Sequence, residues 1–163
     1  MEINHTENFN EKHLKTILQS YAKAKSFKEN RSLIEDIYSK KFNNLSKMNI
    51  YIIKKICEYL DIKKKFINAS EIECKGTKSN LLLQICKKLK CDEYISPQGS
   101  KIYLENDKEI FFDNKIKITY FEYQPLKYET FYNQFLPNLS VIDLILNCGK
   151  VSKKIIIEGI LNS

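Results

Sequence analysis

The sequence predicts an α/β fold, a parallel-sheet, three-layer-like domain with an N-terminal helical section. Two observations carry this prediction. Apolar residues recur every three or four positions through most of the first 60 residues, which is the period of amphipathic helices. After residue 65, short β-branched or aromatic runs alternate with helical segments, an order that implies crossover connections between parallel strands. We expect one domain over residues 11–163, after a disordered or truncated start at residues 1–10.

Three helices are predicted in the N-terminal section. The first begins at Glu11, the second spans 27–42 and the third spans about 46–60, and each has one apolar stripe. The lysine run at 63–65 then leads into a predicted short strand with the sequence FINAS at 66–70.

Helices and strands alternate in the next part of the chain. Ser79 can cap a helix over 80–89, and DEYIS at 92–96 is typical of a short strand. A turn and a short helix are expected at 98–104. The strongest strand signal is IKITYFEY at 116–123, where β-branched and aromatic residues run throughout.

Two helices are predicted near the C-terminal end. Ser140 and Asp143 have the spacing of a capping box, and Gly149 is a natural C-cap, so residues 141–148 are predicted to be helical. The tail at 152–161 is ambiguous, because three successive isoleucines favour a strand while the spacing allows a helix. We favour a helix there.

Composition restricts the class of protein. The chain has 27 Lys and Arg against 20 Asp and Glu, a formal charge of +7, but Arg31 is the only arginine. Nucleic-acid sites favour arginine, so we expect no specific nucleic-acid partner, although a basic nucleic-acid-binding module is an alternative. No apolar run approaches the length of a membrane span, and residues 1–10 lack a signal-peptide core, so a cytoplasmic protein is expected.

The cysteines indicate neither a disulfide framework nor a metal site. There are five, an odd number, and none belongs to a CxxC pair. Both histidines, His5 and His13, lie near the N-terminus. We therefore expect reduced thiols, no bound metal and no evident cofactor.

Three loops are candidates for ligand contacts, because ligands of parallel α/β sheets bind beyond the carboxyl ends of the strands. In the first loop, Gly76 precedes Thr77, Lys78 and Ser79, which would place hydroxyls, an ammonium group and free backbone N–H groups at a helix start. This set is typical of an anion site, although its spacing is not that of a Walker A loop. The alternative interpretation is a helix cap with a solvated lysine.

The second loop follows the strand that ends at Ser96. We expect Ser96, Gln98, Gly99 and Lys101 to contact a phosphate, since a glycine permits a tight backbone and the side chains offer donors. The alternative is a plain strand-to-helix turn capped by Ser100.

The third loop, residues 124–139, carries several aromatic side chains, which suggests either a lid over a pocket or a minor core. It leads into the helix after Ser140, whose N-terminus could face a ligand. Among the acid–base candidates, Asp143 is expected to serve the cap, and Glu122 is placed to face a pocket. No Ser–His–Asp constellation is evident, and neither histidine lies in these loops.

Four segments of the chain carry a family resemblance: HLKTILQSYAKAKSF (13–27), FINASE (66–71), GTKSNLLLQICKKLKCDEYISPQGSKIYL (76–104) and FLPNLSVIDLILNCG (135–149). With them the sequence resembles the WbqC-like family. The last segment is the most specific, because its pattern Phe-x-Pro-x-(Leu/Met)-Ser-x-x-Asp-Leu-x-x-Asn-x-Gly is rare by chance. Its matches are Phe135, Pro137, Leu139, Ser140, Asp143, Leu144, Asn147 and Gly149.

The resemblance implies a bacterial protein associated with O-antigen and other surface-polysaccharide biosynthesis. From it we expect a transferase-type protein that acts on a nucleotide-linked or amino sugar, or on another anionic small molecule. The first two loops would contact phosphates. The site would be shaped from the last helix of the motif by Ser140, Asp143 and Asn147.

Family members usually begin with a strand and a loop like Gln-Pro-x-Tyr-Phe-Pro-x-x-Gly-Tyr, which this sequence lacks. The chain therefore looks like a truncated version of a larger α/β fold. That departure keeps a second function open, a non-catalytic remnant or a partner module of a split enzyme. The protein partners that it implies are a complementing N-terminal half or a second copy of the chain.

Overall fold

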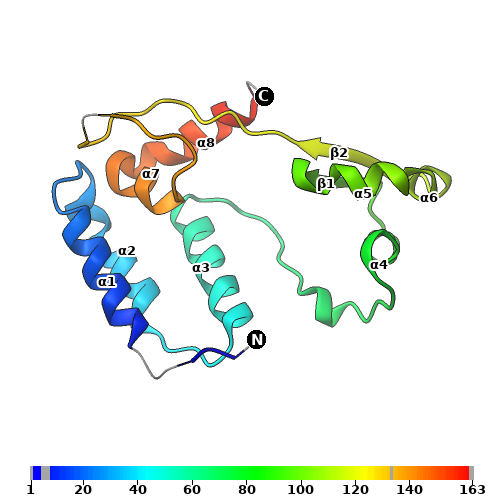
Figure 1. Ribbon diagram of the computed structural model, residues 1–163, viewed down its shortest axis with the longest axis horizontal. Coiled ribbons are helices and arrows are strands. Elements are labelled where there is room, and N and C mark those ends of the chain that lie inside the picture. Colours follow the sequence, from blue (N-terminus) through cyan, green and yellow to red (C-terminus); the bar gives the residue numbers. More distant parts are fainter. Residues whose placement is uncertain (1, 5–7, 133, 162–163) are drawn as a thin grey trace. The chain divides into compact units, whose positions relative to one another are not determined.

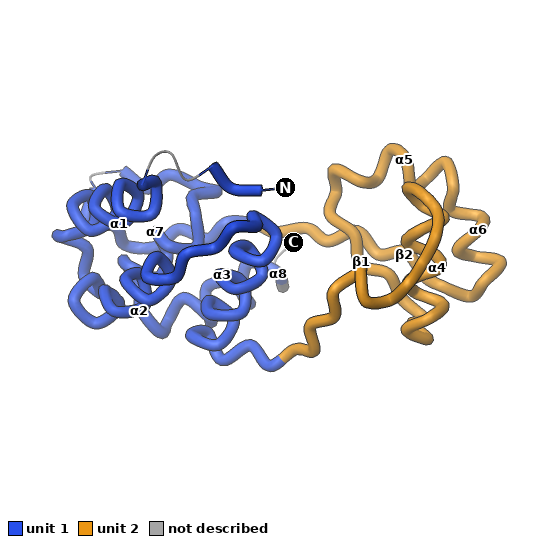
Figure 2. The backbone as a smooth tube through the Cα atoms, turned by 90° about the horizontal axis from the view of Figure 1, so that it is seen from below, with its two compact units in different colours: residues 1–63, 124–162 blue, residues 64–123, 163 orange. Residues whose placement is uncertain are grey.

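The computed structural model describes residues 2–4, 8–132 and 134–161 (Figure 1). Its contacts divide the chain into two compact units, coloured separately in Figure 2. Unit 1 comprises residues 1–63 and 124–162, and unit 2 comprises residues 64–123. The helices, together with a small parallel sheet in unit 2, confirm the predicted α/β class.

Unit 1 is helical. The first three helices begin and end within a few residues of the predicted bounds, and the ambiguous tail is a helix, as we favoured. The helices of this unit are α1 (Phe9–Ser20), α2 (Phe27–Ser39), α3 (Leu45–Tyr59), α7 (Val141–Cys148) and α8 (Ser152–Leu161), with a 3-10 turn, η3 (Gly149–Val151), between the last two.

Helix α7 forms the centre of unit 1. Leu144, Ile145 and Leu146 are almost completely buried, and Leu146 packs in a cluster with residues of α2. The backbone N–H of Ser26 donates to the carbonyl of Leu146 at 3.0 Å, which fixes the start of α2 against α7. The amphipathic period of the first helices therefore serves to cover a nearly all-apolar helix from the far end of the chain.

Unit 2 contains the parallel sheet. Strand β1 (Glu93–Pro97) pairs with β2 (Lys117–Phe121) in parallel, from Glu93 opposite Lys117 to Pro97 opposite Phe121. These are the two strands predicted around DEYIS and IKITYFEY, and their parallel pairing confirms the predicted crossover. Helix α4 (Lys78–Leu89) precedes the sheet, and the crossover consists of η2 (Gln98–Ser100), α5 (Lys101–Asn106) and α6 (Lys108–Asp113).

The sheet of unit 2 packs on one face. Successive side chains of a strand point to opposite faces, so Tyr94 and Ser96 share a face of β1, whereas Ile95 lies on the other. Tyr94 stacks on Phe111 of α6, with ring centroids 6.2 Å apart, in a core that also contains buried residues of α4 and α5. Ile95 is 61% exposed, which shows that the opposite face is open to solvent.

The prediction of a strand at 66–70 is wrong. Residues 66–68 have no regular structure, and η1 (Ala69–Glu71) is a 3-10 turn. The side chain of Asn68 donates to the Glu71 carboxylate, and the Glu71 N–H donates to the Asn68 carbonyl at 2.9 Å. These local hydrogen bonds replace the hydrogen bonds that a strand would form with a neighbouring strand. Among the described residues, no strand pairs with this segment.

Candidate functional site

Residues from both strands meet beyond the carboxyl end of the parallel pair. The Gln98 amide, just after β1, donates to the Glu122 carboxylate, just after β2, at 2.5 Å. The Lys101 ammonium lies 5.5 Å from the centre of the Tyr120 ring. We name this set the strand-end cluster; its members are Ser96, Gln98, Lys101, Tyr120 and Glu122. The sequence placed Ser96, Gln98, Lys101 and Glu122 near such an edge, and the structure brings Gln98 to Glu122 directly.

The strand-end cluster combines three kinds of chemistry. Lys101 offers a cation with three donors, Glu122 offers a carboxylate, and Gln98 offers an amide next to it. Gln98, Lys101 and Glu122 are exposed, so all three can reach a ligand. A side chain built at Gly99 would meet no heavy atom within 4 Å, which leaves open space beside the backbone at this point.

Tyr120 connects the strand-end cluster to an acidic group that the sequence reasoning missed. The Tyr120 hydroxyl and the Lys108 ammonium lower the pKa of Glu105 below its usual range. Burial, and then the same carboxylate, raise the pKa of Tyr120. No local signal located Glu105, which lies on α5 and acts on Tyr120 only through the fold.

Two buried serine hydroxyls in unit 2 have no hydrogen-bond partner among the described residues. Ser96 is fully buried at the end of β1, and Ser79 is 1% exposed in the first turn of α4. An unpaired buried hydroxyl costs about 1–3 kcal/mol of stability. Orphaned donors of this kind are typical of positions where a ligand or a water completes the bonding.

The start of α4 differs from the predicted cap. Thr77, rather than Ser79, occupies the N-cap position, and its side chain makes no capping hydrogen bond. Gly76 has a φ of +128° and Lys78 a φ of +50°, so the chain enters the helix through left-handed backbone. Thr77 and Lys78 are exposed while Ser79 points inward, which separates three residues that we expected to act together.

The third group of predicted residues lies on α7 in unit 1. Ser140 caps the helix by accepting a hydrogen bond from the Ile142 N–H at 3.3 Å. Asp143 was expected to serve this cap, but it is 1% exposed and its carboxylate instead accepts from the hydroxyl of Tyr128 at 2.6 Å and that of Tyr132 at 3.1 Å. Burial, then Tyr132 and Asp143, raise the pKa of Tyr21 far above its usual range. A buried carboxylate surrounded by phenols is therefore kept in hydrogen bonds.

Asn147 completes this arrangement one turn further along α7. Its amide donates to the Asp143 carbonyl at 2.9 Å, and its side-chain oxygen accepts from the Phe131 N–H at 3.3 Å. Phe131 in turn packs on Tyr21, just after α1, with ring centroids 5.9 Å apart. Within the described contacts, Asp143 and Asn147 hold the 124–139 segment on the helix, and the aromatic residues of that segment contribute to a core.

The comparisons with known proteins agree with the motif that contains these residues. A family model described as the WbqC-like protein family matches residues 1–155. The chain belongs to this family. An uncharacterized protein of Mycobacterium tuberculosis is 28% identical over 139 residues, which are 84% of this chain and 59% of the mycobacterial protein. No solved structure matches.

The WbqC-like motif has a physical explanation in unit 1. Ser140 caps α7, Asp143 and Asn147 bind the preceding segment, and Gly149 ends the helix with a φ of +57°. A Cβ at Gly149 would lie 2.9 Å from the Ser26 hydroxyl, so only glycine fits where α2 approaches. The predicted residues thus form separate groups, one in unit 1 and the others in unit 2.

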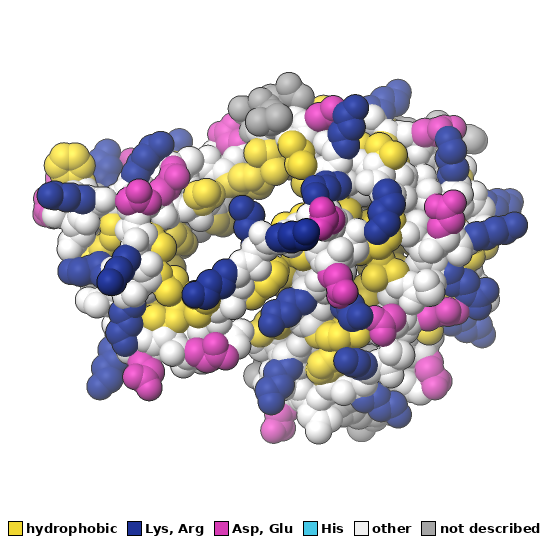
Figure 3. Space-filling view, turned by 180° about the vertical axis from the view of Figure 1, so that it is seen from behind, with side chains coloured by type: hydrophobic (Ala, Val, Ile, Leu, Met, Phe, Trp, Pro, Cys, Tyr) yellow, Lys and Arg dark blue, Asp and Glu magenta, His cyan; other side chains and the backbone are white. Residues whose placement is uncertain are grey.

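The next features concern the distribution of charge, groups of metal ligands and membrane-spanning helices. On the face drawn in Figure 3, lysines are interleaved with acidic side chains instead of forming one basic stripe. Among the residues that the structure describes, no three His, Cys, Asp or Glu side chains are grouped to hold a metal ion. No helix in the same part of the chain is long and apolar enough to cross a membrane.

Proposed function

We propose that this WbqC-like chain is a transferase-type protein of O-antigen or other surface-polysaccharide biosynthesis, which acts in the cytoplasm on a nucleotide-linked or amino sugar. Its ligand site is the strand-end cluster of unit 2. The observation that carries the proposal is the Gln98–Glu122 hydrogen bond beside Lys101. This observation supports the proposal because it involves a cation, an amide and a carboxylate at the edge where parallel α/β sheets bind ligands.

Each residue has a distinct role in this proposal. Lys101 binds a phosphate of the nucleotide, because an ammonium group is a point charge with three donors. Gln98 and Glu122 bind hydroxyl or amino groups of the sugar, and Glu122 is the candidate general base. Ser96 supplies a buried hydroxyl. The following residue, Pro97, has no backbone N–H, so side chains rather than a backbone cradle must hold the phosphate.

The residues at the start of α4 have a supporting role. Thr77 and Lys78 are exposed beside free N–H groups of the first helical turn, and together they are suited to a second anionic group. Ser79 faces the interior, where its unpaired hydroxyl can bind a ligand oxygen or a water. For Ser140, Asp143 and Asn147 we propose a positioning role through the segment that they hold.

Calorimetric titration with UDP-glucose and UDP-N-acetylglucosamine tests the site. We expect Lys101→Ala to weaken binding about tenfold, since a charged hydrogen bond contributes about 1.5–3 kcal/mol and solvent exposure reduces that figure. Lys65→Ala is the matched control, because Lys65 is an exposed lysine of the same unit outside the cluster. Unchanged affinity in both Lys101→Ala and Lys78→Ala would refute the phosphate site.

The competing proposal is that this chain is a partner module of a split enzyme. The chain spans 59% of the mycobacterial relative's length. Sugar-nucleotide binding by this chain alone, with the Lys101 dependence given above, would count against it. A folded chain that binds none of the sugar nucleotides by itself, but does so after a second polypeptide is added, would favour it.

A further inference from the structure

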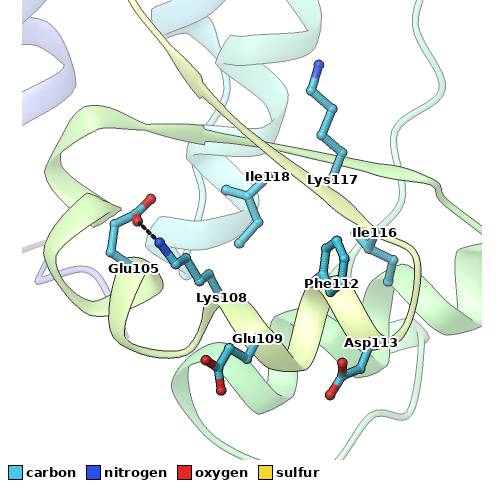
Figure 4. A pocket seen from close by; sticks show the side chains of 8 residues that line it. All are labelled: Glu105, Lys108, Glu109, Phe112, Asp113, Ile116, Lys117 and Ile118. Atoms are coloured by element: carbon cyan, nitrogen blue, oxygen red, sulfur yellow. Dashed lines mark hydrogen bonds and ion pairs between the residues drawn. The ribbon is translucent and has the colours of Figure 1, made fainter.

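A hollow of about 560 Å³ lies beside β2 in unit 2 (Figure 4). Its floor is apolar, formed by Ile116 and Ile118 with Phe112 of α6. Its rim is charged, with carboxylates and lysines from α5, α6 and the start of β2. We name this hollow the β2 groove. Its lining includes no residue of the strand-end cluster, although Tyr120 of that cluster acts on Glu105 at its rim.

The β2 groove runs along the free edge of the strand. Lys117 and Ile118 are consecutive and point to opposite faces of the sheet, yet both line the groove, which places it at the strand's edge. The Lys117 N–H donates to the Asp92 carbonyl at 2.8 Å, on the side of β1. Because backbone groups alternate along a strand, the N–H and C=O groups of Ile118 and Tyr120 point to the other side. In the described part of the chain no third strand pairs there.

The apolar surface in the groove is unusual for an isolated chain. Phe112 is 82% exposed, although its neighbour Phe111 is fully buried in the core of the same unit. Parallel strands normally have both faces covered and further strands alongside. An open edge next to an exposed aromatic ring is therefore a surface to which another strand can add.

The charge of the groove selects the kind of partner. Lys108 is paired with Glu105 at 3.2 Å, and Lys117 is paired with Glu93 at 3.5 Å. Glu109 and Asp113 lie one turn apart on α6, and neither forms an ion pair with a described residue. A chain with a formal charge of +7 thus has a locally acidic groove. Carboxylates repel phosphate-bearing ligands and attract a basic peptide.

We propose that the β2 groove binds an extended, lysine- or arginine-bearing segment of another polypeptide by strand addition. The main chain of the segment pairs with Ile118 and Tyr120, one of its apolar side chains packs on Phe112, and a basic side chain lies between Glu109 and Asp113. Main-chain hydrogen bonds supply affinity in this mode, and the side-chain contacts supply specificity.

Fluorescence anisotropy with the full chain and a labelled peptide tests this proposal. The probe is a six-residue peptide of alternating lysine and valine. One control peptide has glutamate in place of lysine, and another is N-methylated at alternate residues so that one edge cannot donate. Phe112→Ser is the test variant, and Ile102→Ser is its matched control, because Ile102 is 83% exposed in the same unit but lies outside the groove.

We expect the basic probe to bind and the two control peptides to bind at least tenfold more weakly. Phe112→Ser should raise the dissociation constant about tenfold, as for a central aromatic contact, and Ile102→Ser should leave it unchanged. Glu109→Gln combined with Asp113→Asn should weaken binding and reduce its salt dependence.

Four outcomes would overturn the proposal. They are absence of binding, equal binding of the N-methylated peptide, an affinity that Phe112→Ser and Ile102→Ser change alike, and a dimer in sedimentation velocity that Phe112→Ser abolishes. The last would assign the groove to a second copy of the chain. None of them depends on sugar-nucleotide binding, so the two proposals can fail separately.

Discussion

Replacement of Asp143 by alanine tests whether the most buried charge of the WbqC-like motif holds the fold. Its carboxylate is 1% exposed and accepts hydrogen bonds from Tyr128 at 2.6 Å and Tyr132 at 3.1 Å. Each buried donor left without an acceptor costs about 1–3 kcal/mol. Tyr128 is half-buried and Tyr132 is 36% exposed, so we expect Asp143→Ala to lower the free energy of unfolding by about 2 kcal/mol. Asp143→Asn keeps the shape and one acceptor, and should cost less.

A double-mutant cycle with Tyr128→Phe isolates the pairwise contribution. We expect a coupling energy of about 1–2 kcal/mol between Asp143 and Tyr128, since they share one short hydrogen bond. Urea unfolding can be followed by tyrosine fluorescence, because the chain has ten tyrosines and no tryptophan. Glu129→Ala is the control: its carboxylate is exposed and pairs only at the surface with Lys25.

The reasoning fails if Asp143→Ala unfolds within about 0.5 kcal/mol of the wild type, which is the range of ordinary surface substitutions. It also fails if the cycle shows no coupling. Either result would mean that Asp143 does not hold the 124–139 segment, and a direct ligand role would then be the better interpretation of its place in the motif.

Two further predictions concern unit 1. Gly149→Ala should destabilise the protein by about 2–4 kcal/mol in thermal or urea unfolding, because it combines a strained φ with a close contact to Ser26. Adding Ser26→Gly to the same chain should recover only the part of this loss that the steric contact causes. Full stability of Gly149→Ala would contradict the prediction. Lys55, 2.8 Å away, holds the pKa of Asp36 below its usual value by a hydrogen bond, so the stabilisation is present above the unfolded pKa near 4 and is lost as the pH falls through the folded value. Urea midpoints of wild type and Asp36→Asn should therefore differ at pH 7 and converge as the pH falls through the lowered pKa of Asp36, and a constant difference would contradict the pairing.

Local signals were sufficient for most elements. The three- and four-residue apolar period located the first helices, and the spacing of Ser140, Asp143 and Gly149 gave the bounds of α7 to the residue. The β-branched content of IKITYFEY identified β2. These features depend on side chains close in sequence, for which hydrogen bonding and periodic burial decide the backbone.

Other features depended on contacts between distant residues. The FINAS segment has strand-like composition but found no neighbouring strand, so its polar residues bonded locally. The pairing of Gln98 with Glu122, 24 positions away, follows from the parallel register and could not be located from either loop alone. Likewise, the tyrosines that bond Asp143 belong to a segment whose aromatic content suggested either a lid or a core.

The sequence by itself determined the helices other than α6, the two strands and their parallel order, and the family of this protein, because each depends on local spacing or on a short motif. Only the tertiary structure decided that Ser79 turns inward while Thr77 and Lys78 remain exposed. It likewise decided that Asp143 and Asn147 are buried in hydrogen bonds, and that an acidic groove follows the free edge of β2. Burial and hydrogen-bond partners are properties of packing, and packing brings together residues that the chain keeps far apart.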